Sequence, residues 1–103
     1  MKPALFDDEA SAEVAEAYVY YEGIADGLGD RMQEDLVRVL EHISQRPGTY
    51  ALAARIDRSL GIRAAPLFGF PYSVVYVERP DRVRILAFAS QRKRPRYWRG
   101  RIR

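Results

Sequence analysis

Two stretches in the second half of the chain carry apolar side chains at both odd and even positions. They are GFPYSVVYVE (69–78) and RVRILAFAS (82–90), and both are rich in β-branched and aromatic residues. Because neighbouring side chains of a strand point to opposite faces, both faces of these strands must be covered. The apolar sets of the first stretch are Phe70, Tyr72, Val74 and Tyr76 on one face, and Val75 and Val77 on the other. The pattern therefore predicts two central strands of a sheet, joined by a tight turn at Pro80.

Two shorter stretches predict flanking strands. IRAAPLF (62–68) is a weaker strand, and its Pro66 has no N–H to donate to a neighbour, which favours an edge of the sheet or a bulge. PALF (3–6) predicts a further edge strand. We expect these strands to form one small antiparallel sheet.

The first half of the chain has the apolar period of amphipathic helices. Residues 7–27 begin with acidic side chains, which suit a helix N-terminus, and residues 30–47 resume the period after a glycine-rich turn. We expect Asp30 to cap the second helix and Pro47 to end it. The positions expected to meet across the interface are Val14, Tyr18, Tyr21, Leu36, Leu40 and Ile43 from the helices, and Val74, Tyr76 and Ile85 from the strands. The sequence thus predicts an α+β fold, in which an N-terminal helical hairpin packs on the sheet.

The length of 103 residues, without a repeat or linker, predicts a single domain over residues 1–103. Residues 100–103, which begin with Gly100, are expected to form a mobile tail. The chain has no cysteine, and we expect its one histidine, His42, at a solvated helix position. No apolar run approaches the length of a membrane span, and the segment MKPALFDDE turns acidic where a signal peptide is apolar. These features predict a cytoplasmic protein with no cofactor, no metal and no membrane contact.

Charge is divided unevenly along the chain. Residues 1–49 contain four basic and eleven acidic side chains, whereas residues 50–103 contain thirteen basic and three acidic ones. Fifteen of the seventeen basic residues are arginine, whose forked guanidinium pairs with phosphate or carboxylate groups. The basic half predicts a surface that attracts a polyanion or an acidic protein segment.

The segment RKRPRYWRGRIR (92–103) contains seven basic residues, no acidic residue and the only tryptophan. A solvated tail is the simplest interpretation, but the adjacent Tyr97 and Trp98 favour an ordered binding surface, because large aromatic side chains pack or bind. We expect Pro95 to turn the chain so that Trp98 packs on the body of the protein. The arginines expected to point outward are Arg92, Arg94 and Arg99.

The target-binding residues predicted from this pattern are Arg63, Arg92, Arg94, Tyr97, Trp98 and Arg99. Arg82 and Arg84 alternate with Val83 and Ile85, so they fit the solvent face of a strand equally well. No phosphate-binding glycine loop and no serine in a nucleophile elbow accompanies them. The residues therefore favour binding over catalysis.

Several motifs in a fixed order carry a family resemblance. They are YYE, GLGDRMQEDLVRVLEHISQRPGTY, IR, FPYSVVY and ILAFASQRKRPRYW, which together span roughly residues 10–99. In this order they resemble the ParE branch of the RelE/ParE toxin superfamily, whose members have a helical hairpin on an antiparallel sheet. The resemblance implies the toxin of a bacterial type II toxin–antitoxin system, which binds DNA gyrase, blocks replication and is neutralised by a cognate antitoxin. A higher-order toxin–antitoxin complex is implied as well.

The same resemblance leaves two alternatives open. One is a RelE-like endoribonuclease that cuts mRNA on the ribosome, in which Arg63, Arg82 and Arg94 would stabilise charge and Tyr97 would move a proton. The lysines of the RelE branch are absent from residues 47–91, and Ser90 stands where many relatives have histidine, so the sequence favours gyrase binding. The other alternative is a degenerate, non-toxic relative.

Overall fold

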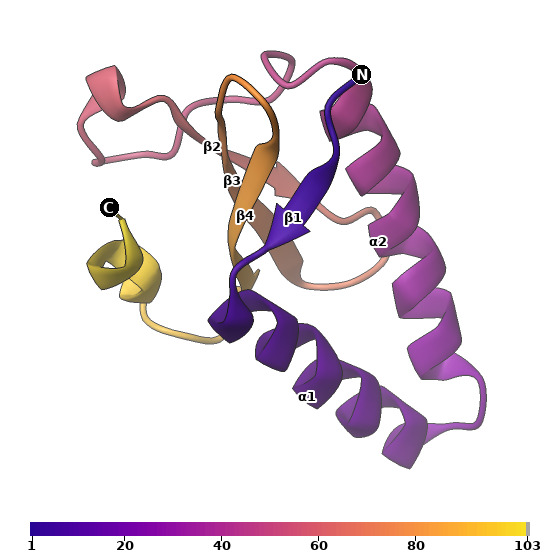
Figure 1. The fold of residues 1–103 in the computed structure, drawn as a ribbon. Helices are drawn as coiled ribbons and strands as arrows, with labels where there is room; N and C mark the ends of the chain where they lie inside the picture. The colour runs from indigo at the N-terminus through magenta and orange to yellow at the C-terminus, as the bar shows by residue number, and fades with distance from the viewer. Residues whose placement is uncertain (103) are drawn as a thin grey trace.

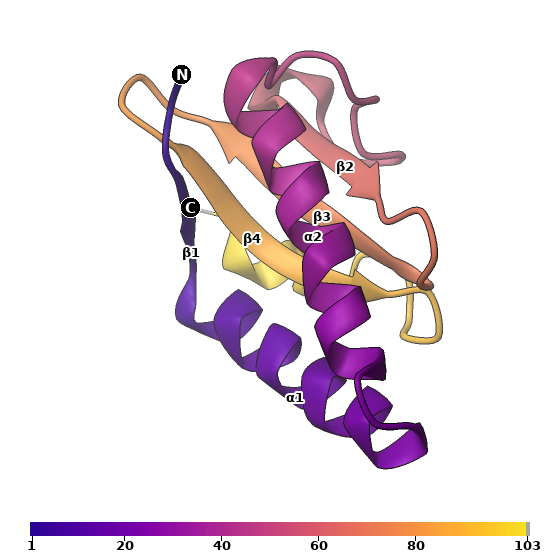
Figure 2. The same cartoon turned by 90° about the vertical axis from the view of Figure 1, so that its right-hand side faces the viewer.

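The computed structural model describes residues 1–102, and these form the predicted α+β architecture (Figure 1). The elements in chain order are β1 (Ala4–Phe6), α1 (Asp8–Ile24), α2 (Leu28–Gln45), the 3-10 helix η1 (Arg58–Leu60), β2 (Ile62–Pro66), β3 (Tyr72–Glu78), β4 (Val83–Ser90) and the 3-10 helix η2 (Tyr97–Arg101). Figure 2 shows α2 lying across one face of the sheet with α1 below it. The segments that contain η1 and η2 lie on the side of the sheet away from α2 (Figure 1).

The sheet has the strand order β1-β4-β3-β2. The pairs β2–β3 and β3–β4 are antiparallel, and β2 with its Pro66 forms an edge, as predicted. The prediction of an entirely antiparallel sheet is wrong in one strand, because β1 pairs with β4 in parallel. The apolar pattern of so short a strand places it in the sheet but does not encode its direction.

A bulge in β4 determines where β1 can pair. Tyr76 pairs with Ile85, whereas the preceding Val75 pairs with Ala87, so Leu86 is an extra residue on β4. The pairing of β1 ends at Ile85, immediately before the bulge. Beyond this point the edge of β4 needs other partners for its backbone groups.

Apolar side chains form a core on each face of the sheet, as the two-faced strands predicted. Between the helices and the sheet, the buried residues include Met32, Leu36, Val39, Ile43, Val74, Tyr76, Val83, Ile85 and Phe88. The predicted contact residues Val14, Tyr18, Tyr21 and Leu40 pack against this cluster but are only partly buried. On the opposite face the buried residues are Ile56, Ile62, Val75, Val77, Leu86, Ala87 and Trp98.

The hairpin turn between α1 and α2 is closed by a side chain from α1. The carboxylate of Glu22 accepts hydrogen bonds from the N–H groups of Gly27 and Gly29, at 3.2 and 2.7 Å. Helix α2 begins at Leu28 after Gly27, whose φ of 85° suits glycine. The prediction of Asp30 as the cap is therefore wrong: it lies inside the first turn and accepts a hydrogen bond from the Tyr18 hydroxyl.

The strand predicted for residues 69–78 begins later in the structure, because a second carboxylate binds the backbone before it. Asp35 of α2 is buried, and it accepts hydrogen bonds from the N–H groups of Phe68 and Gly69. These bonds hold the 67–71 segment as a turn, so β3 begins only at Tyr72.

Across the described chain, neither helix has the length and apolar character that a membrane span requires.

Candidate functional site

The arginine-rich strip, residues 92–99, is an ordered part of the described structure. Trp98 is 5% exposed and packs into the core on the back face of the sheet. Arg92, Arg94 and Arg99 are exposed. The chain reverses at Pro95 and Arg96, and Arg96 adopts a φ of 59° that non-glycine residues seldom occupy. The predicted anchoring of the strip by Trp98 is confirmed by this packing.

Glu13 of α1 fastens the strip to the sheet. Its carboxylate accepts one hydrogen bond from the backbone N–H of Phe88, on the edge of β4 that β1 no longer covers. It also accepts a hydrogen bond from the hydroxyl of Tyr97 and two from the guanidinium of Arg101. Arg101 donates further to the carbonyl of Leu86. We call Glu13, Tyr97 and Arg101 the clasp.

The clasp changes the acidity of its members. Burial raises the pKa of Glu13, but hydrogen bonds from Arg101, Tyr97 and the Phe88 N–H outweigh it and leave the pKa below its ordinary value. Burial and the bond to Glu13 raise the pKa of Tyr97 well above that of a free phenol. Tyr97 therefore keeps its proton at neutral pH and donates it to an ionised carboxylate.

Residues 100–102, which belong to the predicted mobile tail, contact the body of the protein in the structure. Arg101 pairs with Glu13, and its carbonyl accepts a hydrogen bond from Arg84. Arg84 in turn holds Asp7 through two hydrogen bonds of 2.9 and 2.8 Å. Ile102 packs against the core on the back face of the sheet. Arg103 lies outside the described residues.

The other predicted arginines differ in their surroundings. Arg63 on β2 is half-buried and donates to the carbonyl of Tyr50 at 2.7 Å, so it supports the 46–53 loop. Arg82 pairs with its neighbour Asp81 at the β3–β4 turn. Arg99 donates to the carbonyl of Arg55. Arg94 has no ion pair among residues 1–102.

The four residues named for RNA cleavage do not form one constellation. Arg82 and Arg94 belong to opposite ends of β4, and Arg63 lies on β2 at the far edge of the sheet. Tyr97 is committed to Glu13. Of the six predicted target-binding residues, five lie in the strip. Trp98 is buried, so it is not available for direct contact with a target.

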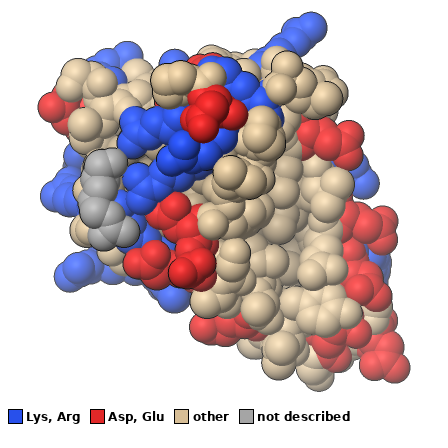
Figure 3. All heavy atoms as spheres, viewed as in Figure 1, with Lys and Arg blue, Asp and Glu red and all other residues tan. Residues whose placement is uncertain are grey.

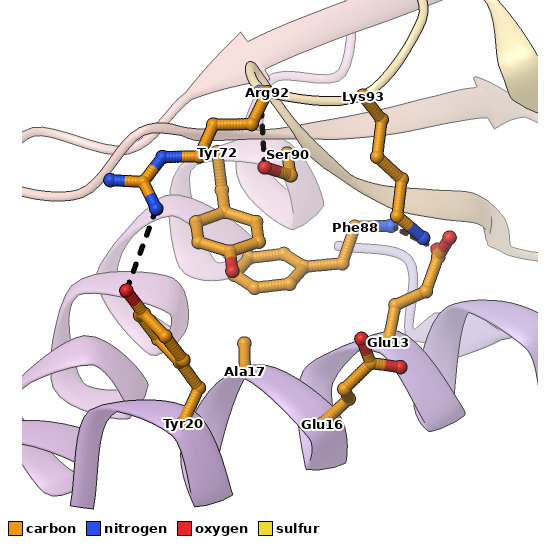
Figure 4. A pocket seen from close by; sticks show the side chains of 9 residues that line it. All are labelled: Glu13, Glu16, Ala17, Tyr20, Tyr72, Phe88, Ser90, Arg92 and Lys93. Atoms are coloured by element: carbon orange, nitrogen blue, oxygen red, sulfur yellow. Dashed lines mark hydrogen bonds between the residues drawn. The ribbon is translucent and has the colours of Figure 1, made fainter. Parts of the chain in front are cut away.

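Two of the clefts beside the strip are lined by both Ser90 and Lys93. The first has a volume of about 320 Å³ and lies between α1 and the end of β4 (Figure 4). The stacked rings of Tyr72 and Phe88 line it, with Arg92 and Tyr20 on one side and Lys93 beside Glu13 on the other. Arg92 is within 3.5 Å of the Tyr20 hydroxyl, and its backbone N–H donates to the hydroxyl of Ser90.

The second cleft has a volume of about 300 Å³ and lies on the back face of the sheet, between the 53–54 loop and the strip. Its lining combines small side chains from three strands, the aromatic side chains of Tyr97 and Trp98, and basic residues of the strip. The lining residues include Ala64, Ser73, Val75, Ala89 and Gln91, with Lys93, Arg94 and Arg96 on the strip side. We call it the back cleft.

The charge division of the sequence is also a division in space. Figure 3 shows acidic residues along the side that carries α2 and near the start of α1, and basic residues mainly on the opposite side. Within residues 1–102, no group of three or more acidic or histidine side chains could hold a metal ion. His42 is exposed on α2, as predicted.

Sequence reasoning missed Glu13, Arg101 and Asp7. The sequence pattern indicates only ordinary helix charges for Asp7 and Glu13, and it places Arg101 in the predicted tail. Glu13 and Arg101 are 88 positions apart, and no local pattern signals a contact over such a separation.

Comparison with known proteins identifies the fold. No family model matches the sequence, and no curated protein sequence matches it. A search of solved structures finds a chain of the structure described as "Chromosomal ParDE TA system from P. aeruginosa", with a TM-score of 0.73 and 18% sequence identity. The match covers 87% of this chain and 96% of that chain. Together with the sheet and helix arrangement, this likeness shows that the chain has the ParE-like fold.

Proposed function

We propose that the protein is the toxin of a type II toxin–antitoxin system and that it inhibits growth by binding DNA gyrase. The observation that carries the proposal is the likeness to a chain of a ParDE toxin–antitoxin system over most of both chains. The ordered strip supports it, because Arg92, Arg94 and Arg99 are exposed on a fixed backbone. A binding inhibitor needs such a surface and needs no catalytic group of its own.

The cognate antitoxin is the second partner in this proposal. Exposed apolar side chains such as Val19, Tyr20 and Phe68 lie on the same molecule as the basic surface. An acidic antitoxin segment that folds on binding would cover both kinds of surface. Expression of the protein alone should therefore arrest growth, and co-expression of its antitoxin should restore it.

The test is tightly controlled expression with pulse labelling of DNA and protein synthesis. An early stop in DNA synthesis supports gyrase, whereas an early stop in translation supports the ribosome and would overturn the gyrase proposal. The triple variant Arg92→Ala, Arg94→Ala, Arg99→Ala should lose toxicity. Its control removes the same charge from α2 and its end, through Arg31→Ala, Arg38→Ala and Arg46→Ala, and should remain toxic. Harmless accumulation of the intact wild-type protein in growing cells would refute toxicity altogether.

A further inference from the structure

The outer face of helix α1 is apolar and is not covered by another element among residues 1–102. Helix α1 packs on α2 and β4 with its inner side, and in Figures 1 and 2 no other element lies on its outer side. The side chains of Val19, Tyr20 and Ile24 in its second half are 70, 50 and 58% exposed. Large apolar side chains exposed together on one helix indicate a surface that another molecule covers.

Small residues lie beside these side chains on the same face. Ala12, Ala15 and Gly23 are exposed, and they stand at helical spacing from Val19. A Cβ atom at Gly23 would meet nothing within 4 Å, so the surface there is open. A row of side chains spaced by three and four residues is the pattern by which helices pack on one another, and small residues in the row let a second helix approach closely. The face therefore has the shape of a helix-packing surface.

Charges of both signs border this face. Helix α1 contains acidic residues and no basic one, and its Glu16 is exposed and has no ion pair among residues 1–102. One turn further along α1, the guanidinium of Arg92 from the strip is within 3.5 Å of the Tyr20 hydroxyl. Arg92 also has no ion pair within the described chain. A partner with charges of one sign would compensate only Glu16 or only Arg92, whereas a second copy of this chain carries both.

We infer that the outer face of α1 is a contact between two copies of this chain, with the two helices antiparallel and Val19 at the two-fold axis. In this arrangement Ala15 of each copy lies opposite Gly23 of the other, so the helices approach closely on both sides of the axis. The contact is self-complementary, as a two-fold symmetric interface must be. One helix face is smaller than a typical stable interface, so we expect a weak dimer whose population depends on concentration. The inference goes beyond the proposed function, because it concerns the free protein whether or not the protein is toxic.

The charges favour the antiparallel orientation. With Val19 at the axis, Glu16 of each copy lies beside Tyr20 and Arg92 of the other copy. The symmetric contact then compensates both charges in both copies, which electrostatic complementarity rewards. In a parallel pair of helices the two Glu16 carboxylates would face each other and repel.

The first test is sedimentation equilibrium of the purified full-length chain over a hundredfold range of protein concentration. The wild type should show a monomer–dimer equilibrium. Val19→Asp places two carboxylates at the two-fold axis and should weaken the dimer at least tenfold. Val37→Asp is the matched control, because Val37 is 51% exposed on α2, and it should leave the dimer within twofold of wild type. A wild type that stays monomeric at every concentration, or equal losses in the two variants, would overturn the inference.

A charge exchange tests whether the two charged groups meet across the contact. Glu16→Arg alone and Arg92→Glu alone should each weaken the dimer at least fivefold, because each places like charges together. The double variant restores opposite charges and should bring the dimer back to within twofold of wild type. A double variant as weak as the single variants would contradict the antiparallel arrangement.

Introduced cysteines test the register directly, since the chain has no cysteine of its own. A disulfide forms only between residues whose Cβ atoms lie close together. Under mild oxidation Val19→Cys should therefore cross-link to itself, and Ala15→Cys mixed with Gly23→Cys should cross-link faster than either variant alone. Val37→Cys is the control and should remain uncross-linked at the same concentration. Faster cross-linking of Ala15→Cys to itself than to Gly23→Cys would show a parallel contact and overturn the inference.

Discussion

The carboxylate of Glu13 and the guanidinium of Arg101 form a two-bond ion pair, with both N–O distances at 3.0 Å. The pair joins the second turn of α1 to the end of η2. Their side chains are only 11% and 17% exposed, so water screens the pair weakly. The position of the whole strip depends on this contact, because Tyr97 shares the same carboxylate.

Removal of Arg101 should therefore destabilise the fold. Arg101→Ala would leave the carboxylate of Glu13 with its main partner missing, and breaking a buried pair in this way costs about 3–5 kcal/mol. We expect a value toward the lower end of that range, because both groups retain some exposure. Urea denaturation measures the loss. Arg99→Ala is the control, since Arg99 is exposed and its side chain meets only the carbonyl of Arg55, so it should cost less than about 1 kcal/mol.

The same contact predicts how stability depends on acid pH. The pKa of Glu13 lies below its ordinary value in the folded protein, so the native state binds fewer protons than the unfolded state near pH 4.5. Stability from Glu13 is then fully present above that pH and is lost as the pH falls through the lowered pKa. The difference in unfolding free energy between wild type and Glu13→Gln should shrink between pH 6 and pH 3. A difference that does not change with pH would mean that Glu13 is not ionised in the clasp.

The sequence predicted the architecture better than it predicted the site. Apolar side chains at both odd and even positions of residues 69–78 and 82–90 are a local signal that predicts burial on both faces, and a core lies on each face of the sheet, as predicted. Trp98 was predictable for the same reason, because a large aromatic side chain beside charged neighbours needs a place to pack.

The contacts that sequence reasoning missed are polar and non-local. Glu22, Asp35 and Glu13 each capture backbone N–H groups that secondary structure leaves unpaired. The backbone amides that remain unpaired are determined by the place where a turn closes or where a bulge interrupts strand pairing. The bulge at Leu86 in β4 is an example. Such details depend on the assembled fold. The sequence of a helical segment does not distinguish an acidic residue that binds a backbone amide from one that is solvated.

Two glycines near the helix hairpin should respond in opposite ways to alanine. A Cβ atom at Gly29 would lie 2.8 Å from the Tyr18 ring and 2.9 Å from the Glu22 side chain, whereas one at Gly23 would meet nothing within 4 Å. Gly29→Ala should cost about 1–3 kcal/mol through overpacking. Gly23→Ala should stabilise helix α1 by about 0.4–1 kcal/mol. Thermal unfolding of both variants measures the two effects, and a stabilising Gly29→Ala would show that the hairpin is not closely packed there.

Trp98 should couple the stability of the back face to the order of the strip. Trp98→Ala removes the largest side chain of that core, and such truncations cost about 3–5 kcal/mol. The substitution leaves every arginine in place in the sequence. Any loss of toxicity in the folded variant would therefore result from a changed position of the arginines and not from a loss of positive charge. Limited trypsin digestion should cut after Arg96 and Arg99 faster than in wild type, while cleavage after Arg31 and Arg38 in α2 stays slow. Trp98→Phe, which retains an apolar ring, should restore most of the protection. Equal cleavage of the strip in wild type and Trp98→Ala would show that the tryptophan does not hold it.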